Sequence, residues 1–157
     1  MIGQNSDYKI GDADRRPWGS YVVTGVGKAG DGRDYCEKEI IIAPGQILSL
    51  QSHKLRQEFW TLREGSLTVI RDSERRVLDP GQSIDIPVGA IHCMANLGIV
   101  ACVVTERQEG TCREDDIIRY SDVYNRDTVQ ADAKVEESIV LYQQVLEDID
   151  QLKKNIA

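Results

Sequence analysis

The sequence contains few histidines, phenylalanines and prolines, and it has no long apolar run. Its 157 residues include two histidines, one phenylalanine and four prolines. No segment reaches the roughly 18 consecutive apolar residues that a membrane-spanning helix needs. The N-terminal segment also lacks the apolar core of a signal peptide. These absences lead us to expect a cytoplasmic protein with no membrane partner.

The four cysteines show no CxxC pair and no spacing typical of a disulfide framework. They are Cys36, Cys93, Cys102 and Cys112. Such cysteines are typical of reduced, buried thiols in a cytoplasmic protein. We expect Cys93 to pack on the face opposite to that of its neighbour His92, because successive side chains of a strand alternate between faces.

Positive charge is also in deficit, since 19 Lys and Arg stand against 26 Asp and Glu and the net charge is −7. A chain of this charge repels polyanions on average, so we expect no nucleic-acid partner. A local basic pocket remains compatible with 19 cationic side chains. The length suits one domain, and a hydrophobic fraction of 41% is enough for a packed core.

Short apolar runs separated by turn residues fill the chain from residue 17 to residue 126, after a polar segment (1–16) that we expect to be flexible. Nine strands at this spacing predict an all-β sandwich or barrel rather than βαβ units. We expect Trp18 and Trp60 to fill its core or line its rim. The predicted strands are Ser20–Thr24, Cys36–Ala43, Ile47–Gln51, Glu58–Arg63, Ser66–Arg71, Arg75–Leu78, Ser83–Ile86, Ile91–Ala95 and Ile99–Glu106.

The pattern changes in the C-terminal part, residues 127–157. Apolar residues recur there at spacings of four and three, which predicts an amphipathic helix from about Thr128 to Asn155. Its apolar stripe would lie either on the domain or on a second copy of the chain. The stripe consists of Val135, Ile139, Tyr142, Leu146 and Ile149.

Both histidines fall within one glycine-framed pattern, Gly45-x5-Gln51-x-His53-x4-Glu58-x6-Gly65 followed by Gly81-x5-Pro87-x-Gly89-x2-His92-x3-Asn96. Gln51 and His53 are two residues apart on a predicted strand and therefore leave the same face. Two imidazoles, a carboxylate and an amide oxygen suit Zn²⁺, and also Mn²⁺, Co²⁺, Ni²⁺ or Fe²⁺. The pattern predicts a site for one divalent metal, with zinc favoured.

This pattern resembles the two motifs of the cupin superfamily, with Gln51 in place of the first histidine. Four further segments narrow the resemblance to the type II mannose-6-phosphate isomerase (phosphomannose isomerase) domain. They are RPWGSY (16–21), PGQILSLQSH (44–53), RQEFW (56–60) and EDDIIRY (114–120). The likeness extends over residues 15–126. The chain lacks a GxGxRLxP loop, so the nucleotidyltransferase activity of fused relatives is not expected.

The resemblance implies a double-stranded β-helix, the cupin jelly-roll barrel, with Gln51, His53, Glu58 and His92 as metal ligands. The implied reaction is aldose–ketose isomerisation of mannose 6-phosphate to fructose 6-phosphate through a cis-enediolate. Among the cationic side chains, Arg56 is the first candidate for contact with the substrate or the enediolate. Arg119 and Lys38 are further substrate-binding candidates, and Lys54 is a candidate general base beside the ligands. A homodimer is also expected, with the C-terminal helix as a contributor.

The sequence departs from the family pattern at positions that bear on catalysis. Leu55 and Phe59 stand where the family carries polar or histidine residues, and the strand before Pro44 has fewer basic residues than is usual. These changes favour a second hypothesis, a non-catalytic cupin that binds metal and sugar with a diverged pocket. A third hypothesis, an Fe²⁺ oxygenase, is disfavoured because Gln51 replaces an imidazole.

Overall fold

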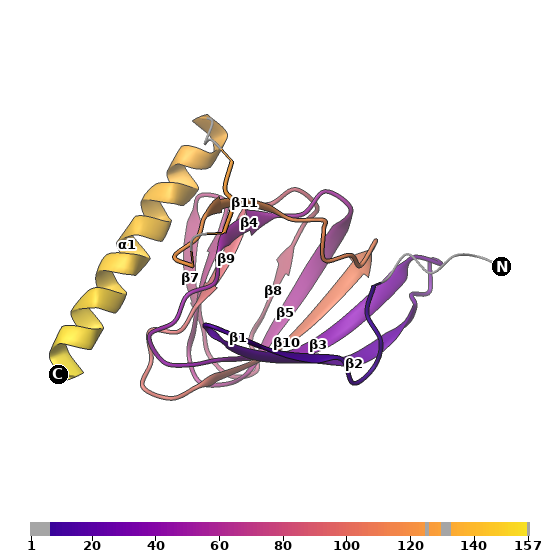
Figure 1. The fold of residues 1–157 in the computed structure, drawn as a ribbon, viewed down its shortest axis with the longest axis horizontal. Coiled ribbons are helices and arrows are strands. Elements are labelled where there is room, and N and C mark those ends of the chain that lie inside the picture. The colour runs from indigo at the N-terminus through magenta and orange to yellow at the C-terminus, as the bar shows by residue number, and fades with distance from the viewer. Residues whose placement is uncertain (1–6, 125, 130–132, 157) are drawn as a thin grey trace.

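Two antiparallel sheets face each other, and helix α1 (Ala133–Ile156) covers the outer face of one of them (Figure 1). The computed structural model describes residues 7–124, 126–129 and 133–156. One sheet has the strand order β1-β2-β3-β10-β5-β8 and the other β11-β4-β9-β6-β7. The strands are β1 (Ala13–Arg16), β2 (Gly19–Lys28), β3 (Asp34–Ile42), β4 (Leu50–Ser52), β5 (Arg56–Glu64), β6 (Leu67–Arg71), β7 (Glu74–Leu78), β8 (Ser83–Ile86), β9 (His92–Ala95), β10 (Cys102–Gly110) and β11 (Ile118–Ser121).

The chain passes back and forth between the sheets from β3 onward. β3, β5, β8 and β10 belong to the first sheet, and β4, β6, β7, β9 and β11 to the second. This alternation winds the chain into a double-stranded β-helix, so the predicted jelly-roll barrel with a C-terminal helix is confirmed. Within the described residues, α1 is not apolar enough over its length to cross a membrane.

Inward-facing side chains change from apolar to polar along the central strands. On β10 the buried residues run from Cys102 and Val104 to Glu106 and Gln108. On β5 they run in the reverse direction, from Arg56 to Leu62, because β5 and β10 are antiparallel. One end of the barrel is therefore a dry core, which includes Trp18 and Trp60 as expected. The other end is lined by polar groups.

Helix α1 places its apolar stripe on its own domain. Tyr142, Val145 and Ile149 are at most 4% exposed, and they belong to one cluster with Leu50 and Cys93 of the second sheet. Cys93 thus faces the helix while His92 faces the barrel interior, as the alternation of the strand predicts. The helix begins later than expected, at residue 133, and residues 130–132 lie outside the described part of the chain.

The expectation of a flexible segment over residues 1–16 is wrong for its described part. Residues 13–16 form β1, which pairs with β2, and Tyr8 is buried. Residues 1–6 lie outside the described residues. β1 has an exposed, polar sequence without alternation, so no apolar pattern marks it as a strand.

Two other strand predictions need correction. The last predicted strand begins at Cys102 rather than Ile99, because Ile99 and Val100 lie in an exposed bend. β11 was not predicted, since its four residues are all half-buried and give no apolar face. The predicted strand Ser83–Ile86 is observed with the same bounds as β8, and the remaining predicted strands are present with shifted ends. Ile47 contributes an isolated bridge to Ala95 before β4 begins.

Candidate metal centre and cavity

Three of the four predicted metal ligands meet inside the polar end of the barrel. His53 follows β4, Glu58 lies on β5 and His92 begins β9. Their ligand atoms lie within 4.8 Å of one another. Each histidine Nε2 is 3.5 Å from a different oxygen of the Glu58 carboxylate. All three side chains are buried, so they form a compact donor set shielded from solvent.

Backbone carbonyls fix the orientation of both imidazoles. His53 Nδ1 lies 2.5 Å from the carbonyl oxygen of Asp116, and His92 Nδ1 lies 3.0 Å from that of Ala90. A ring nitrogen bonded to a carbonyl must carry the proton, so Nε2 presents its lone pair to the cluster. Burial, with His92 and Arg56 nearby, lowers the pKa of His53 to about 3. The neutral ring that results is the form that binds metal.

The loop that carries His53 is held by groups distant in sequence. The Asp116 carboxylate accepts hydrogen bonds from the backbone N–H groups of Lys54 and Leu55, both at 2.9 Å. Gly89, at φ 80°, donates its N–H to the His53 carbonyl at 2.9 Å. The motif segments 87–89 and 114–120 therefore position the ligand, although neither supplies a metal donor itself.

Gln51 lies beside the three ligands on β4, directly opposite His92 in the sheet. Its Nε2 is 3.5 Å from His92 Nε2, and its Oε1 accepts a hydrogen bond from the Ser49 hydroxyl at 2.9 Å. A half-turn of the amide exchanges the two atoms, because the Ser49 hydroxyl can also accept a hydrogen bond. Gln51 can thus offer an amide oxygen at the position where the two histidine Nε2 atoms and the Glu58 carboxylate converge.

Arg56 is buried against the cluster. Its Nε donates to Glu58 Oε2 at 3.2 Å, its Nη2 lies 3.3 Å from His53 Nε2, and its Nη1 donates to the Arg113 carbonyl at 2.7 Å. Burial alone would raise the pKa of Glu58, but the adjacent Arg56 charge, with His92, lowers it below its usual value. Glu58 therefore stays an anion, as a metal ligand must.

A second carboxyl group, Glu106 on β10, lies next to Glu58 and was missed by the sequence analysis. Trp60 Nε1 lies 3.3 Å from Glu58 Oε1 and 3.2 Å from Glu106 Oε1, and so bridges the two carboxyl groups. Gln108 donates to the other Glu106 oxygen at 3.1 Å. Burial and the neighbouring Glu58 raise the pKa of Glu106 to about 7. The alternation of faces along β10, which turns every second side chain inward, is the signal that could have identified Glu106 as an interior residue.

Lys38 also reaches the cavity, as the sequence analysis anticipated for a substrate-binding residue. It is buried on β3, directly opposite Glu106 in the register of the sheet. Its Nζ lies 3.8 Å from the ring centre of Tyr8 and 4.7 Å from that of Tyr21. These cation–π contacts hold the ammonium group beside the carboxyl groups.

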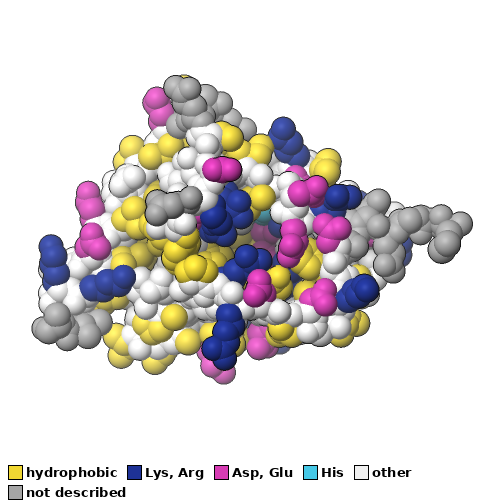
Figure 2. All heavy atoms as spheres, viewed as in Figure 1, with side chains coloured by type: hydrophobic (Ala, Val, Ile, Leu, Met, Phe, Trp, Pro, Cys, Tyr) yellow, Lys and Arg dark blue, Asp and Glu magenta, His cyan; other side chains and the backbone are white. Residues whose placement is uncertain are grey.

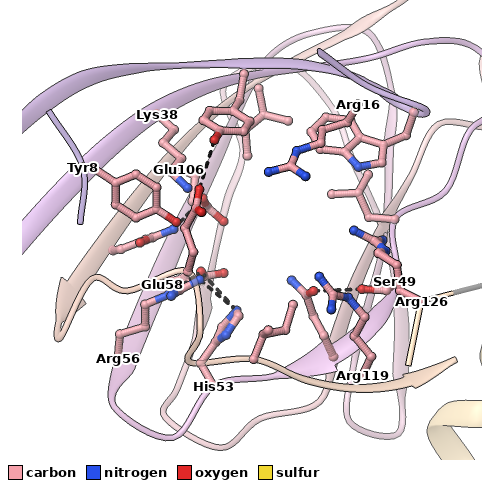
Figure 3. A pocket seen from close by; sticks show the side chains of 18 residues that line it. Tyr8, Arg16, Lys38, Ser49, His53, Arg56, Glu58, Glu106, Arg119 and Arg126 are labelled. Atoms are coloured by element: carbon pink, nitrogen blue, oxygen red, sulfur yellow. Dashed lines mark hydrogen bonds and ion pairs between the residues drawn. The ribbon is translucent and has the colours of Figure 1, made fainter. Parts of the chain in front are cut away.

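The cluster opens into a cavity of about 270 Å³ between the two sheets. Lys and Arg side chains gather around the hollow in Figure 2, and a histidine is visible in its depth. Figure 3 shows Arg16, Arg119 and Arg126 on one side of the cavity and Lys38, Tyr8 and Glu106 on the other. Arg119 was predicted as a site residue, whereas Arg16 and Arg126 were not proposed for the site, although Arg16 belongs to the RPWGSY motif.

Lys54 lies outside this cavity, so its predicted role as general base is wrong. Its side chain is exposed and is not among the residues that line the cavity. Lys54 and Leu55 form an exposed bend between His53 and Arg56, which are both buried. Leu55 and Phe59 are likewise 55% and 49% exposed. The two substitutions therefore lie on the outer surface, and the expectation that they alter the pocket is also wrong.

Sequence comparison places the chain in a known family. The family described as "Mannose-6-phosphate isomerase C-terminal" matches residues 4–122. The chain belongs to this family. Its relatives include the mannose-1-phosphate guanylyltransferase of Escherichia coli (37% identity) and the alginate biosynthesis protein AlgA of Pseudomonas aeruginosa (40% identity). Each alignment covers 71% of this chain but only 22% of the relative, so the chain spans about a fifth of their length.

Solved structures confirm the cupin fold at low sequence identity. The capsular polysaccharide assembling protein CapF of Staphylococcus aureus superposes with a TM-score of 0.59 at 18% identity, over 68% of this chain and 33% of CapF. KdgF from Halomonas sp. superposes with a TM-score of 0.55 at 18% identity, over 65% and 86%. At this identity the likeness concerns the fold alone. Cupins commonly bind a metal, and the His53–Glu58–His92 cluster is compatible with that property.

Proposed function

We propose that the chain is a metal-dependent aldose–ketose isomerase of hexose 6-phosphates, which converts mannose 6-phosphate to fructose 6-phosphate. The observation that carries this proposal is the buried His53–Glu58–His92 cluster with Arg56 in contact with two of its members, at the base of a cationic cavity. Family membership supports the substrate class. The cavity is basic although the chain as a whole has a net charge of −7. Its positive charge is therefore a local feature of the site and not a property of the whole surface.

The donor set fits a divalent metal, with zinc favoured. Both Nε2 lone pairs and the Glu58 carboxylate converge, and Gln51 can supply an amide oxygen beside them. When bound, the metal would polarise the sugar oxygens and stabilise negative charge that develops on them. Arg56 borders the same position and would contribute positive charge to the same oxygens.

Proton transfer would be carried out by a group that lines the cavity. Isomerisation removes a proton from C2 of the open-chain aldose and leaves a cis-enediolate. It then returns a proton to C1, while the proton of the C2 hydroxyl passes to the C1 oxygen and the C2 oxygen becomes the carbonyl, so no atom is gained or lost. The position of Glu106 in the cavity, beside the ligand cluster and hydrogen-bonded to Trp60 and Gln108, supports it as the group that carries out this transfer.

A coupled assay with mannose 6-phosphate, run with and without Zn²⁺, tests the proposal. We expect zinc-dependent formation of fructose 6-phosphate that is lost in Gln51→Ala and His92→Ala. The exposed Lys54→Ala serves as the matched control and should retain activity. Bound zinc without turnover of any hexose phosphate would instead support the alternative, a non-catalytic metal- and sugar-binding cupin.

A further inference from the structure

Three arginines from separate segments meet on one side of the cavity. Arg16 ends β1, Arg119 lies on β11, and Arg126 lies in the segment after β11. All three line the same cavity, opposite Lys38 and Glu106 (Figure 3). Like charges repel one another, so a fold that gathers three guanidinium groups around one cavity needs a compensating anion.

Within the described part of the chain, acidic residues neutralise the charges of these three arginines to different extents. Arg126 is paired with Asp122, with Nε 2.7 Å from Oδ2, and Arg16 lies 3.3 Å from Asp14. For Arg119, no ion pair is found within the described part of the chain, and its Nε is buried there without a hydrogen-bond partner. Burial, followed by the charge of Arg126, lowers the pKa of Arg119. Arg119 therefore has donors and charge available for a ligand.

We propose that Arg16, Arg119 and Arg126 bind the phosphate of the substrate and so fix the direction in which it enters. A planar guanidinium group can donate to two phosphate oxygens at once. The Nε–H of Arg119 supplies a donor that no described residue uses. This assignment rests on the proposed function. It adds which residues hold the phosphate and which end of the sugar meets the ligand cluster.

The two sides of the cavity match the two ends of the substrate. A hexose 6-phosphate carries its phosphate on C6 and reacts at C1 and C2, at the other end of its carbon chain. Phosphate on the arginine side would direct C1 and C2 toward Glu58, His53 and Glu106. It also gives β1 a role in the site, because Arg16 is its last residue. The segment that lacks an apolar pattern would then be retained for ligand binding.

Calorimetric titration of the full chain with inorganic phosphate, mannose 6-phosphate and mannose tests the assignment. We expect both phosphorylated probes to bind, and Arg119→Gln to weaken each by about 10- to 100-fold, the range for a hydrogen bond to a charged group. Arg16→Gln should weaken binding in the same direction. Arg76→Gln, which removes an exposed arginine of β7 paired with Glu74, is the matched control and should bind as the parent does.

Separate readouts distinguish this assignment from the isomerase proposal. Metal content should be unchanged in Arg119→Gln, and the effect in the coupled assay should be a raised KM with a smaller change in kcat. Phosphate binding lost in Arg119→Gln, in a protein without isomerase activity, would uphold the assignment and reject the reaction. An active isomerase whose phosphate affinity and KM are unaffected by Arg119→Gln and Arg16→Gln would overturn the assignment. Circular dichroism melting verifies that each variant is folded. Arg119→Lys keeps the positive charge without the planar guanidinium group, so its affinity for the phosphorylated probes should lie between those of the parent and Arg119→Gln.

Discussion

Buried charge at the polar end of the barrel is the clearest feature at the scale of single residues. Arg56, Glu58 and Glu106 are each at most 7% exposed in the interior of a small domain. Burial of charged groups costs several kcal/mol each unless partners compensate them. The hydrogen bonds of Trp60 and Gln108 supply part of that compensation. A sequence that keeps such groups inside the barrel is typical of a functional site.

Glu106→Gln tests the role of the second carboxyl group. Glutamine keeps the shape and can still accept the hydrogen bond from Trp60, but it cannot take up a proton. We expect kcat of the isomerase to fall by about 10²- to 10⁴-fold, with metal content unchanged. Glu109→Gln, three residues along β10 in a surface pair with Arg107, should have little effect. Full activity in Glu106→Gln would exclude it as the proton-transfer group.

Substitution of Phe59 or Leu55, unlike that of Glu106, should have little effect on activity. Because both side chains are about half exposed on the outer surface, Phe59→Ser and Leu55→Ser should leave metal binding, KM and kcat within about twofold of the parent. The measurements are metal analysis and the coupled assay. A large loss of activity in Phe59→Ser alone would mean that the outer surface of β5 contributes to the reaction.

The grouping of His53, Glu58 and His92, with Gln51 beside them, could be predicted from sequence, whereas much of the cavity could not. Gln51, His53, Glu58 and His92 carry a spacing that identifies them together. Glu106 has no such spacing, because it meets Glu58 only through the pairing of β10 with β5. Lys54 was misassigned because it lies in the exposed bend between β4 and β5, where adjacency to His53 in sequence does not bring its side chain to the cavity.

At the scale of elements, strands with an apolar face could be predicted and those without one could not. The sequences of β8 and β6 are alternating or apolar, and both strands were predicted close to their observed bounds. β1 and β11 lie at the edges of the two sheets and bury little apolar surface. Pairing with a neighbouring strand defines them, and pairing partners are not visible in one sequence. These same edge strands carry Arg16 and Arg119. Arg16 was missed with its strand, whereas Arg119 was identified through the EDDIIRY motif and not through the strand that holds it.

Helix α1 stabilises the domain through the residues that face the second sheet. Ile149→Ala should lower the free energy of unfolding by about 2–5 kcal/mol, because the side chain is buried in the helix–sheet cluster. Val140→Ala, on the 56% exposed side of the same helix, should change it by less than about 0.5 kcal/mol. Urea denaturation measures both. Equal effects would contradict the packing of the helix on its own domain.

At the scale of the whole molecule, unpaired sheet edges bear on assembly. β1 and β8 end the first sheet, and β7 and β11 end the second. Exposed edges favour pairing with another chain, and a closed dimer would cover some of them. The apolar stripe of α1 is already used within the domain, so the helix is a weaker candidate for the contact than the edges. We expect light scattering to give twice the chain mass, unchanged in Val140→Asp. A monomeric mass would contradict the homodimer.

Metal binding should be visible as stability of the whole domain, independently of any reaction. The ligands come from β5, β9 and the loop after β4, so a bound ion would join both sheets. An ion that binds only the folded state stabilises it by about 2.7 kcal/mol when present at 100 times its Kd. We therefore expect Zn²⁺ to raise the Tm of chelator-treated protein by several degrees. His92→Ala should lose this rise, whereas the exposed Lys54→Ala should retain it. An equal zinc-dependent rise in His92→Ala would place the metal elsewhere, whatever the outcome of the isomerase assay.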